Sequence, residues 1–538
     1  MKTLIPLLLL FTFFSCQTEQ DHSAIKGVWL GTAEVEPYPE FVKFSYDSFP
    51  EVQLYELQHE QRTVVDFEQK SGEVAFPLDK DGKLGLFQGK LEEGVIKGSF
   101  ILDEKKDYQC NLMKVFPMGL QDVSQLVGFY QVAPQHVIEV LPYPISQTVT
   151  GLAISDYKTG KYRIAFPISP SKFVAGKKFL TPYPSDLSFT LIGKNSNGVP
   201  GIEFEDEGTV YKATRMPDLE KDDYEDFEVQ NGEIELACTI SFPREGEKFP
   251  LVINVAGAGD QVRANQYTNH LTLLPRNGVA VLTFDKRGCG NSTGDIYTSS
   301  YQDFASDVLA IIEAMKKNPK IDASKIGLTG FDQAGFVMPI VASKSKDVKF
   351  IASLAGSAMS AEAQEYVACQ QRMESDGFDA VEVNEALSYQ KNMFKYFRNE
   401  MDSNAFKQIS EEAKTKTWAS GRYVTFFDNK KYINQWKYRY DFDPVPYLNK
   451  SKVPMLIVYG ENDLIAPPKY NFPIIKRVYE KNPNSQNQLI LYENANHLFM
   501  LGENRGDLQI TEVKGYAPGL FNKITDWVLK QFEMERKV

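Results

Sequence analysis

The feature that most constrains the fold is a series of short apolar segments in the second half of the chain. These segments cover residues 250–255, 279–284, 350–354, 455–459 and 488–492. Between the second and the third of them, residues 301–317 carry apolar side chains at the spacing of an amphipathic helix. Strands that are apolar throughout and alternate with helices form a parallel sheet whose two faces are both covered. The sequence therefore predicts an α/β domain with a mostly parallel sheet, beginning near residue 218.

The pattern of strands is interrupted between residues 357 and 443. This segment is polar, aromatic-rich and helical in its periodicity, and it contains both Trp418 and Trp436. An insertion of this kind in an array of strands and helices is typical of a helical cap over the carboxyl edge of the sheet. We therefore expect residues 218–356 and 444–538 to form the α/β core and residues 357–443 to form the cap.

The first part of the chain has a different texture. Its short alternating segments are separated by Gly, Pro and Asp/Lys turns and show no sustained helical period, which indicates all-β structure. A coarse repeat is also present, because Trp29 and Tyr130 are 101 residues apart and so are Lys114 and Arg215. The sequence therefore predicts a multidomain chain that begins with two all-β modules. These modules are residues 26–118 and residues 119–217.

The N-terminus has the pattern of a signal segment. One lysine is followed by a largely apolar stretch, residues 4–14, which is too short to span a bilayer core of about 30 Å at about 1.5 Å per residue. Residues 1–15 are therefore expected to be removed. The Ser15-Cys16 pair resembles the end of a bacterial lipobox, which implies a lipid anchor on Cys16, a tether over residues 16–25 and a place at the outer membrane of a bacterial cell envelope. The alternative is an ordinary secretory signal followed by an incidental cysteine.

Composition excludes several other classes of function. The formal net charge is −12 and no run of basic residues is present, so a nucleic-acid partner is not expected. The cysteines have no CxxC spacing, so we expect neither a metal nor another cofactor. Disulfide pairing is left open among Cys110, Cys238, Cys289 and Cys369. The partners expected are a small-molecule substrate or ligand and, through the anchor, the membrane, while the oligomeric state is left open.

Ligands of an open parallel sheet bind beyond the carboxyl ends of its strands, so the loops at those ends are the candidates for a site. Residues 327–335 form a strand that turns sharply into a helix, with Asp332 at the turn. Asp463 and His497 each follow a later strand. Histidine is scarce, and no other histidine follows His270, so His497 is the one imidazole that the later strands offer.

Three motifs occur in the order of a known family. They are FDKRGCGNSTG at residues 284–294, the block YDFDPVPYLNKSKVPMLIVYGENDLIAPPKYN, and NANHLF at residues 494–499. From about Tyr224 to the C-terminus the chain resembles the α/β-hydrolase family, in particular its esterase-like and serine-aminopeptidase-like members with a β-rich N-terminal region. The resemblance implies a triad with Asp332 as nucleophile, Asp463 as acid and His497 as base. It also implies backbone donors to an oxyanion at Ala256, Gly257 and Gln333.

The nucleophile position departs from the family pattern. The family motif Gly-x-Ser-x-Gly carries a serine on a strained turn, whereas residues 330–335 read Gly-Phe-Asp-Gln-Ala-Gly. In one interpretation Asp332 is itself the nucleophile, as in the haloalkane-dehalogenase and epoxide-hydrolase branches, and the protein hydrolyses small or lipophilic esters, epoxides or halides. Donors to the leaving group would then come from the cap. The candidates are Trp418, Tyr423, Trp436 and Tyr438.

In the other interpretation the site is inactive and the protein is a ligand-binding or scaffold lipoprotein. An aspartate performs acyl transfer poorly, because attack on an ester gives a reactive anhydride and its charge repels the developing oxyanion. The same argument disfavours peptide hydrolysis. The retention of both Asp463 and His497 favours the first interpretation.

Two neighbouring features are expected to have structural roles. The segment Asp285-Lys286-Arg287 is expected to brace the edge of the sheet. A helix is predicted over residues 267–277, with His270 at its surface.

Overall fold

The structure is a computed structural model that describes most of the chain. The described residues are 23–33, 40–46, 50–56, 59–64, 68–70, 73–80, 83–102, 106–145, 148–177, 180–194, 200–219, 223–263, 268–502 and 513–538. The predicted signal segment, Cys16 and all but the end of the predicted tether lie outside these residues, so the lipid anchor stays a prediction. Within the described ranges, no helix combines the length and the apolar character needed to cross a membrane.

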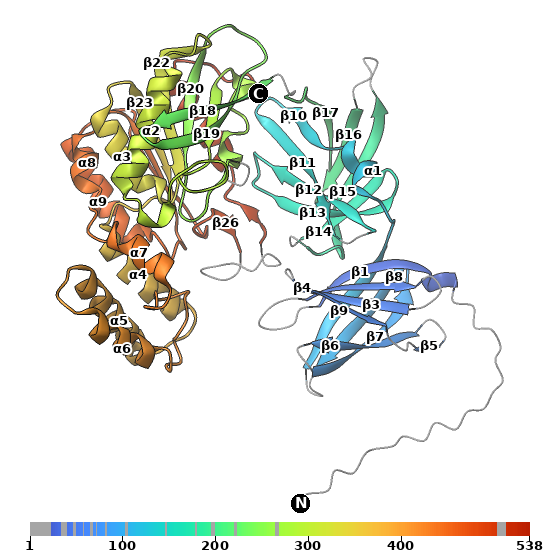
Figure 1. The fold of residues 1–538 in the computed structure, drawn as a ribbon. Coiled ribbons are helices and arrows are strands. Elements are labelled where there is room, and N and C mark those ends of the chain that lie inside the picture. The colour runs from blue at the N-terminus through green and yellow to red at the C-terminus, as the bar shows by residue number, and fades with distance from the viewer. Residues whose placement is uncertain are drawn as a thin grey trace, which may run out of the picture. The chain divides into compact units, whose positions relative to one another are not determined.

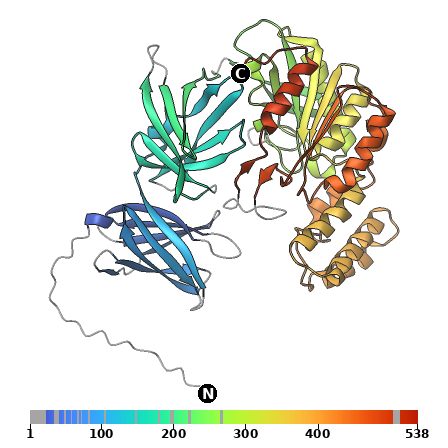
Figure 2. The ribbon, with the colours of Figure 1, turned by 180° about the vertical axis from the view of Figure 1, so that it is seen from behind.

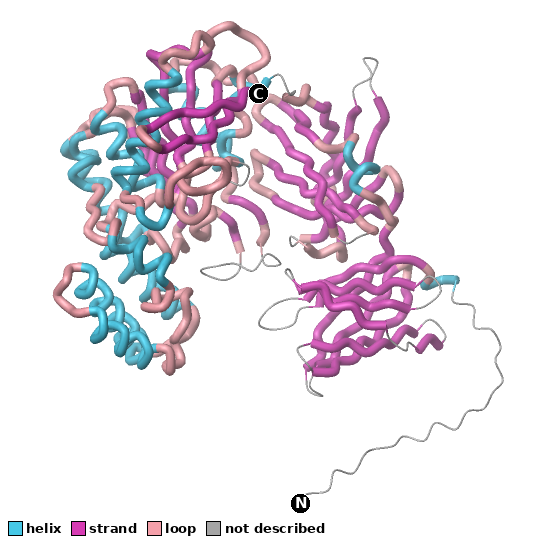
Figure 3. The backbone as a smooth tube through the Cα atoms, in the orientation of Figure 1, coloured by secondary structure: helices cyan, strands magenta, loops and turns pink. Residues whose placement is uncertain are grey.

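The chain divides into two compact units. The first contains residues 1–117 together with residues 168–170, and the second contains residues 118–167 and 171–538. Figure 3 shows the change of secondary structure along the chain, from modules built almost wholly of strands to a region in which helices and strands alternate. The predicted fold class, two all-β modules followed by an α/β region with a helical insertion, is confirmed.

The first module is a nine-stranded antiparallel sheet with the order β4-β3-β2-β1-β9-β8-β7-β6-β5. Its strands are β1 Gly27–Ala33, β2 Glu40–Tyr46, β3 Pro50–Glu56, β4 His59–Val64, β5 Glu68–Lys70, β6 Glu73–Lys80, β7 Lys83–Glu92, β8 Val95–Leu102 and β9 Lys106–Val115. Among the side chains that the structure describes, alternate residues of β1, β2 and β6–β9 meet in a core that includes Trp29, Phe44, Phe76 and Phe87. This burial explains the alternating pattern in the sequence.

The second module is a closed antiparallel barrel that follows the short helix α1 Leu120–Ser124. Its strands are β10 Gly128–Ala133, β11 His136–Pro144, β12 Thr150–Asp156, β13 Tyr162–Ser169, β14 Lys172–Gly176, β15 Ser185–Lys194, β16 Pro200–Asp206 and β17 Thr209–Arg215. Apolar side chains, among them Tyr130, Phe173 and Phe189, fill its interior. A barrel of this strand number is just wide enough for side chains to fill.

The sequence repeat has a structural counterpart in both modules. Trp29 of β1 is the cross-strand partner of Lys114 in β9, and Tyr130 of β10 is the partner of Arg215 in β17. The indole N–H of Trp29 donates to a backbone carbonyl four residues earlier, and so does the hydroxyl of Tyr130. Each module therefore joins its first and last strands through the same pair of positions.

The α/β region contains an eight-stranded sheet with the order β18-β19-β21-β20-β22-β23-β24-β25. Its strands are β18 Tyr224–Asn231, β19 Ile234–Ser241, β20 Phe249–Val255, β21 Ala280–Phe284, β22 Ile321–Phe331, β23 Val348–Leu354, β24 Met455–Gly460 and β25 Gln488–Tyr492. The six strands from β20 onward are parallel, and the hairpin β18–β19 adds an antiparallel edge. The mostly parallel sheet is thus confirmed.

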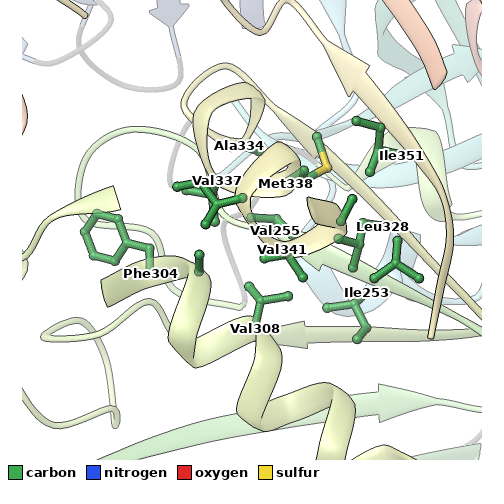
Figure 4. Packing of buried hydrophobic residues seen from close by; sticks show 14 of the residues in the cluster. Ile253, Val255, Phe304, Val308, Leu328, Ala334, Val337, Met338, Val341 and Ile351 are labelled. Carbon is green, nitrogen blue, oxygen red and sulfur yellow. The ribbon is translucent and has the colours of Figure 1, made fainter. Parts of the chain in front are cut away.

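Helices cover both faces of this sheet (Figure 1). One face packs against α2 Tyr301–Met315, α3 Ala334–Lys344, α8 Val445–Lys450 and α9 Pro468–Lys481. Figure 4 shows side chains of α2 and α3, such as Val308 and Val341, lying against Leu328 of β22. The other face packs against α10 Leu520–Gln531, the red helix of Figure 2, through Trp527. Burial on both faces is why these strands are apolar throughout.

The cap consists of α4 Ala361–Ser375, α5 Ala380–Phe397, α6 Ser403–Ala413 and α7 Lys430–Lys437. It has a hydrophobic core of its own, in which Tyr389, Phe394 and Trp418 are buried. The aromatic residues that mark this insertion in the sequence therefore form the core that holds its helices together.

The structure corrects one expectation from the sequence and answers one question that the sequence left open. The predicted helix over residues 267–277 is absent, and the described part of that segment forms two 3₁₀ turns, Asn269–Leu271 and Pro275–Asn277. Pro275 has no N–H to continue a helical ladder, which explains the break. The second concerns disulfides, since the four cysteines whose pairing was left open are all free and buried.

Candidate active site

The turn from β22 into α3 holds Asp332 in a left-handed backbone conformation with φ of +54°. The conformation is fixed from both sides, because the N–H of Asp332 donates to Leu354 and its carbonyl accepts from Gly335, both at 2.9 Å. A Cβ at Gly335 would lie 2.6 Å from the Cα of Gly356. A non-glycine residue with positive φ stores strain of about 1–3 kcal/mol and persists only where the surroundings impose it. This is the geometry of a nucleophile elbow, and it raises the side chain of Asp332 above the sheet.

Asp463 and His497 form a buried pair beside this turn. Asp463 follows β24, and one of its oxygens lies 2.9 Å from Nδ1 of His497. Its other oxygen accepts from the backbone N–H groups of Ile465 and Ala466, each at 2.8 Å. With both oxygens engaged and the residue only 1% exposed, Asp463 has one orientation, and it fixes the imidazole.

The structure brings the three predicted residues together. Nε2 of His497 lies 3.7 Å from Oδ1 of Asp332, and the ring of Phe331 packs against the imidazole with centroids 4.8 Å apart. Oδ2 of Asp332 faces the opposite way and accepts from the N–H of Ala258 at 3.3 Å. The two oxygens of the carboxylate therefore have different environments, one facing a base and one facing a backbone donor.

The recorded donor to Asp332 is a neighbour of Ala256 and Gly257, which together with Gln333 are the predicted backbone donors to an oxyanion. The donor from the loop after β20 is Ala258, one residue beyond the predicted pair, because the carbonyl of Gly257 points away and accepts from Nζ of Lys286 at 2.7 Å. The side chain of Gln333 also accepts from Lys286, at 2.6 Å. These contacts use the carbonyl of Gly257 and the side chain of Gln333, so the predicted backbone N–H donors at Ala256, Gly257 and Gln333 stay a prediction.

Lys286 was expected to brace the edge of the sheet but lies beneath the site instead. Its side chain is buried, and burial lowers its pKa to about 7, an effect that the nearby Arg439 reinforces. Its neighbours do brace the loop, since Asp285 accepts from the N–H groups of Arg263 and Asn291, and Arg287 pairs with Asp307. The motif FDKRG was the only signal for Lys286, and that motif does not say which of its charged residues turns inward.

Glu365 on α4 is a second residue that the sequence analysis missed. Burial raises the pKa of its carboxyl to about 7, and the negative charge of Asp332 adds to this, while Arg372 acts in the opposite direction. A glutamate in a polar helical segment has no pattern that distinguishes it from a solvated one. The cap thus places a carboxyl that is easily protonated within electrostatic range of the elbow carboxylate.

Three of the four cap aromatics proposed as leaving-group donors have other partners. Trp418 is buried in the core of the cap and donates to Glu385 at 3.1 Å, and the hydroxyl of Tyr423 donates to a carboxylate at the end of α4. Trp436 packs against the aromatic side chains of α5, and Tyr438 is 50% exposed. These rings stabilise the cap, and their contacts do not support the role predicted for them at Asp332.

His270 also differs from expectation. It is 5% exposed, and its Nε2 lies 3.1 Å from Oγ1 of Thr329 on β22, so it is a buried hydrogen-bonded residue and not a surface one. A search for metal ligands among the described residues finds no group of three or more His, Cys, Asp or Glu side chains that could hold an ion.

The charge state of His497 provides a first prediction. Burial opposes protonation of the imidazole, but the carboxylate and hydrogen bond of Asp463 and the carboxylate of Asp332 outweigh it and raise the pKa of His497. Its protonation therefore stabilises the folded chain at low pH, and this contribution is lost as the pH rises through the raised pKa. In Asp332→Asn the pKa of His497 should fall, because one of two stabilising charges is removed. Nuclear magnetic resonance titration of labelled histidine measures this shift, with His497→Asn as the assignment control, and an unchanged pKa contradicts the pairing.

Comparison with known proteins places the α/β region in a family. Residues 231–498, which include Asp332, Asp463 and His497, match the family model of X-Pro dipeptidyl-peptidase (S15 family). The uncharacterised peptidase YuxL of Bacillus subtilis (strain 168) is 29% identical over 99 residues. That match spans 17% of this chain and only 15% of the relative.

Several solved structures are similar to the chain, among them an esterase and a peptidase. Est1E from Butyrivibrio proteoclasticus with bound ferulic acid is 18% identical with a TM-score of 0.36, covering 57% of this chain and 99% of that one. Proline iminopeptidase from Mycobacterium smegmatis is 15% identical with a TM-score of 0.33, covering 51% and 92%. The family match agrees with the strand order, the turn at Asp332, and the acid and histidine after β24 and β25. On these grounds the chain belongs to the α/β-hydrolase family.

Proposed function

We propose that this α/β-hydrolase-type hydrolase uses Asp332 as a nucleophile against a saturated carbon of a small or lipophilic substrate of the epoxide, halide or alkyl ester type. The observation that carries the proposal is the asymmetric setting of the Asp332 carboxylate. Oδ1 lies 3.7 Å from Nε2 of His497, whereas Oδ2 accepts from the N–H of Ala258 at 3.3 Å. A serine hydrolase needs a hydroxyl at this vertex, and an aspartate supplies a charged oxygen instead.

In the first step Oδ1 of Asp332 displaces the leaving group from carbon. A new carbon–oxygen bond forms and the bond from that carbon to the leaving atom breaks. A halide or a carboxylate departs with the electron pair, whereas the oxygen of an opened epoxide stays on the substrate and takes a proton from solvent. The product on the protein is an alkyl ester of Asp332 in which Oδ2 is the carbonyl oxygen. No proton transfer to His497 is required in this step, because the carboxylate is already ionised and needs no general base to activate it.

In the second step His497 takes a proton from water, and the water oxygen attacks the carbonyl carbon of the ester. Negative charge develops on Oδ2, where the N–H of Ala258 already donates. Collapse of this intermediate releases the alcohol, which takes the proton back from His497. The carboxylic acid left on Asp332 carries one oxygen from water, and it loses its proton to solvent to restore the carboxylate. Asp463 stabilises the imidazolium that forms, through the contact of 2.9 Å to Nδ1.

Peptide hydrolysis is not proposed, although the matching family model describes a peptidase. An amide is cleaved by attack at its carbonyl carbon, and attack by a carboxylate there gives an anhydride. The position that would need a hydroxyl is Asp332, and the neighbouring residues of the turn are Phe331 and Gln333. The proposal therefore concerns electrophilic carbon outside amides.

A second candidate is a binding protein that does not turn its ligand over. One observation favours it, because the charge of Asp332 raises the pKa of His497 and so holds a larger fraction of the imidazole in the protonated form, which cannot act as a base. In this case the pocket recognises a ligand and the Asp332–His497 pair is structural. The experiment below separates the two candidates.

The test is a single turnover in heavy-oxygen water with a panel of epoxides, alkyl halides and esters. Under the proposal, one ¹⁸O atom enters the carboxylate of Asp332, and mass spectrometry of the peptide that contains it shows a gain of about 2 Da per cycle. The matched control is Asp463→Asn, which leaves the nucleophile in place and slows incorporation. Turnover without label in Asp332 contradicts the covalent route, and absence of both label and turnover across the panel supports the binding protein.

A further inference from the structure

Lys286 is the buried charge that the reaction steps above do not use. Its ammonium group donates to the carbonyl of Gly257 at 2.7 Å and to Oε1 of Gln333 at 2.6 Å. It also lies 4.7 Å from the centroid of the Phe304 ring. Among the described residues, none of the hydrogen bonds of this group goes to a carboxylate, so Nζ of Lys286 is satisfied by neutral oxygens. Burying a charged group is costly unless it is paired and hydrogen-bonded, so the hydrogen bonds of Lys286 are what stabilise it in this position.

The peptide group between Gly257 and Ala258 connects Lys286 to the nucleophile. A trans peptide is planar, so its C=O and its N–H point in opposite directions. The carbonyl of this peptide is held by Lys286 at 2.7 Å, and its N–H is aimed at Oδ2 of Asp332 at 3.3 Å. An orientation that satisfies Lys286 therefore also directs the N–H of Ala258 to the nucleophile.

The contact with Gln333 adds a second constraint. Gln333 directly follows Asp332 in the turn and is 7% exposed. Because Nζ of Lys286 binds both Gln333 and Gly257, it connects the turn to the loop after β20. This connection constrains the distance between Oδ2 of Asp332 and the N–H of Ala258. When Lys286 is protonated, its hydrogen bond to the carbonyl oxygen of Gly257 also polarises the peptide and strengthens the N–H of Ala258 as a donor.

We infer that Lys286 is a positioning residue, which orients the Gly257–Ala258 peptide so that its N–H stabilises the oxyanion formed on Oδ2 of Asp332. The inference rests on the proposed function and extends it by assigning the residue that sets the donor. Lys286 itself does not touch the reacting atoms. Its effect should fall on the hydrolysis of the ester, where charge develops on Oδ2, and much less on ester formation.

The kinetic test compares Lys286→Met with wild type for both steps. Loss of one oxyanion donor typically lowers the rate by about 100-fold to 1000-fold, and we expect about 100-fold slower breakdown of the ester with formation changed less than about threefold. The ester should then accumulate on Asp332 even with His497 intact, and intact-protein mass spectrometry detects it.

Lys317→Met, at an exposed lysine on the surface, should behave as wild type. Equal slowing of both steps would mark general damage and overturn the inference.

A second readout needs no turnover. Gly257-Ala258 is the only Gly-Ala pair in the sequence, so carbonyl-¹³C glycine with ¹⁵N alanine gives one amide resonance. In Lys286→Met and in a second variant, Lys286→Gln, this amide proton should shift upfield and exchange faster with solvent, because it loses its alignment with Asp332. An unshifted resonance overturns the positioning role. If the resonance shifts while no substrate labels Asp332, the proposed function fails and the positioning role stands.

Discussion

Replacing His497 by asparagine is expected to stop turnover and to leave one alkyl group on Asp332 of each protein molecule. The first step needs only the carboxylate, whereas the second needs a base for water. Removal of a general base typically costs about 10²-fold to 10⁴-fold, so we expect breakdown of the ester to slow by about 10³-fold. The variant should remain folded, because the carboxylate of Asp463 keeps its bonds from the N–H groups of Ile465 and Ala466.

The measurement is the intact mass of His497→Asn after incubation with a substrate that wild type consumes. The gain should equal the alkyl part of the substrate, and peptide mapping should place it on the segment that contains Asp332. Asp332→Asn/His497→Asn is the matched control and should show no gain. A modification found on any other residue, or a variant that keeps turning over, would rule out the assignment of His497 as the base of the second step.

The fold could be predicted because its signals are local. Strands buried on both faces are apolar throughout, and this pattern located the segments that became β20, β21, β23, β24 and β25. The repeat between Trp29 and Tyr130 was also visible in the sequence, and the structure shows that each anchors the strand pair that joins the ends of its module. The segment around Pro275 was misread because apolar spacing alone does not reveal that proline breaks the ladder.

The site was predictable in its side chains and not in its backbone. Asp332, Asp463 and His497 come together because the carboxyl ends of parallel strands share one edge. The donor at Ala258 depends on which way one peptide group faces, and that is decided by Lys286, which is distant in sequence. Aromatic residues in the cap were assigned to the site by composition alone, but a cap of four helices needs a core, and Trp418 is part of it.

The largest loss of stability is expected from Asp307→Ala. Asp307 on α2 is 1% exposed and receives two hydrogen bonds from Arg287, at 2.6 and 2.9 Å, and one from Asn231 at 2.7 Å. In the alanine variant, the guanidinium group of Arg287 would lose the carboxylate that is its main partner. Breaking such a pair from one side typically costs about 3–5 kcal/mol, and we expect a loss of that size in the free energy of unfolding of the α/β sheet.

Because the chain has several domains, the loss should be measured locally, by hydrogen exchange and mass spectrometry on peptides from β20 and β22. Lys316→Ala is the control, since Lys316 pairs with Glu313 and Asp347 on the exposed side of the same fold, where water screens the charges. Exchange in this control should match wild type. Arg287 directly follows Lys286, so Asp307→Ala should also loosen the Gly257–Ala258 peptide and slow ester breakdown. A stable Asp307→Ala protein with normal exchange would show that the loop is held by other contacts and that Lys286 is positioned without this brace.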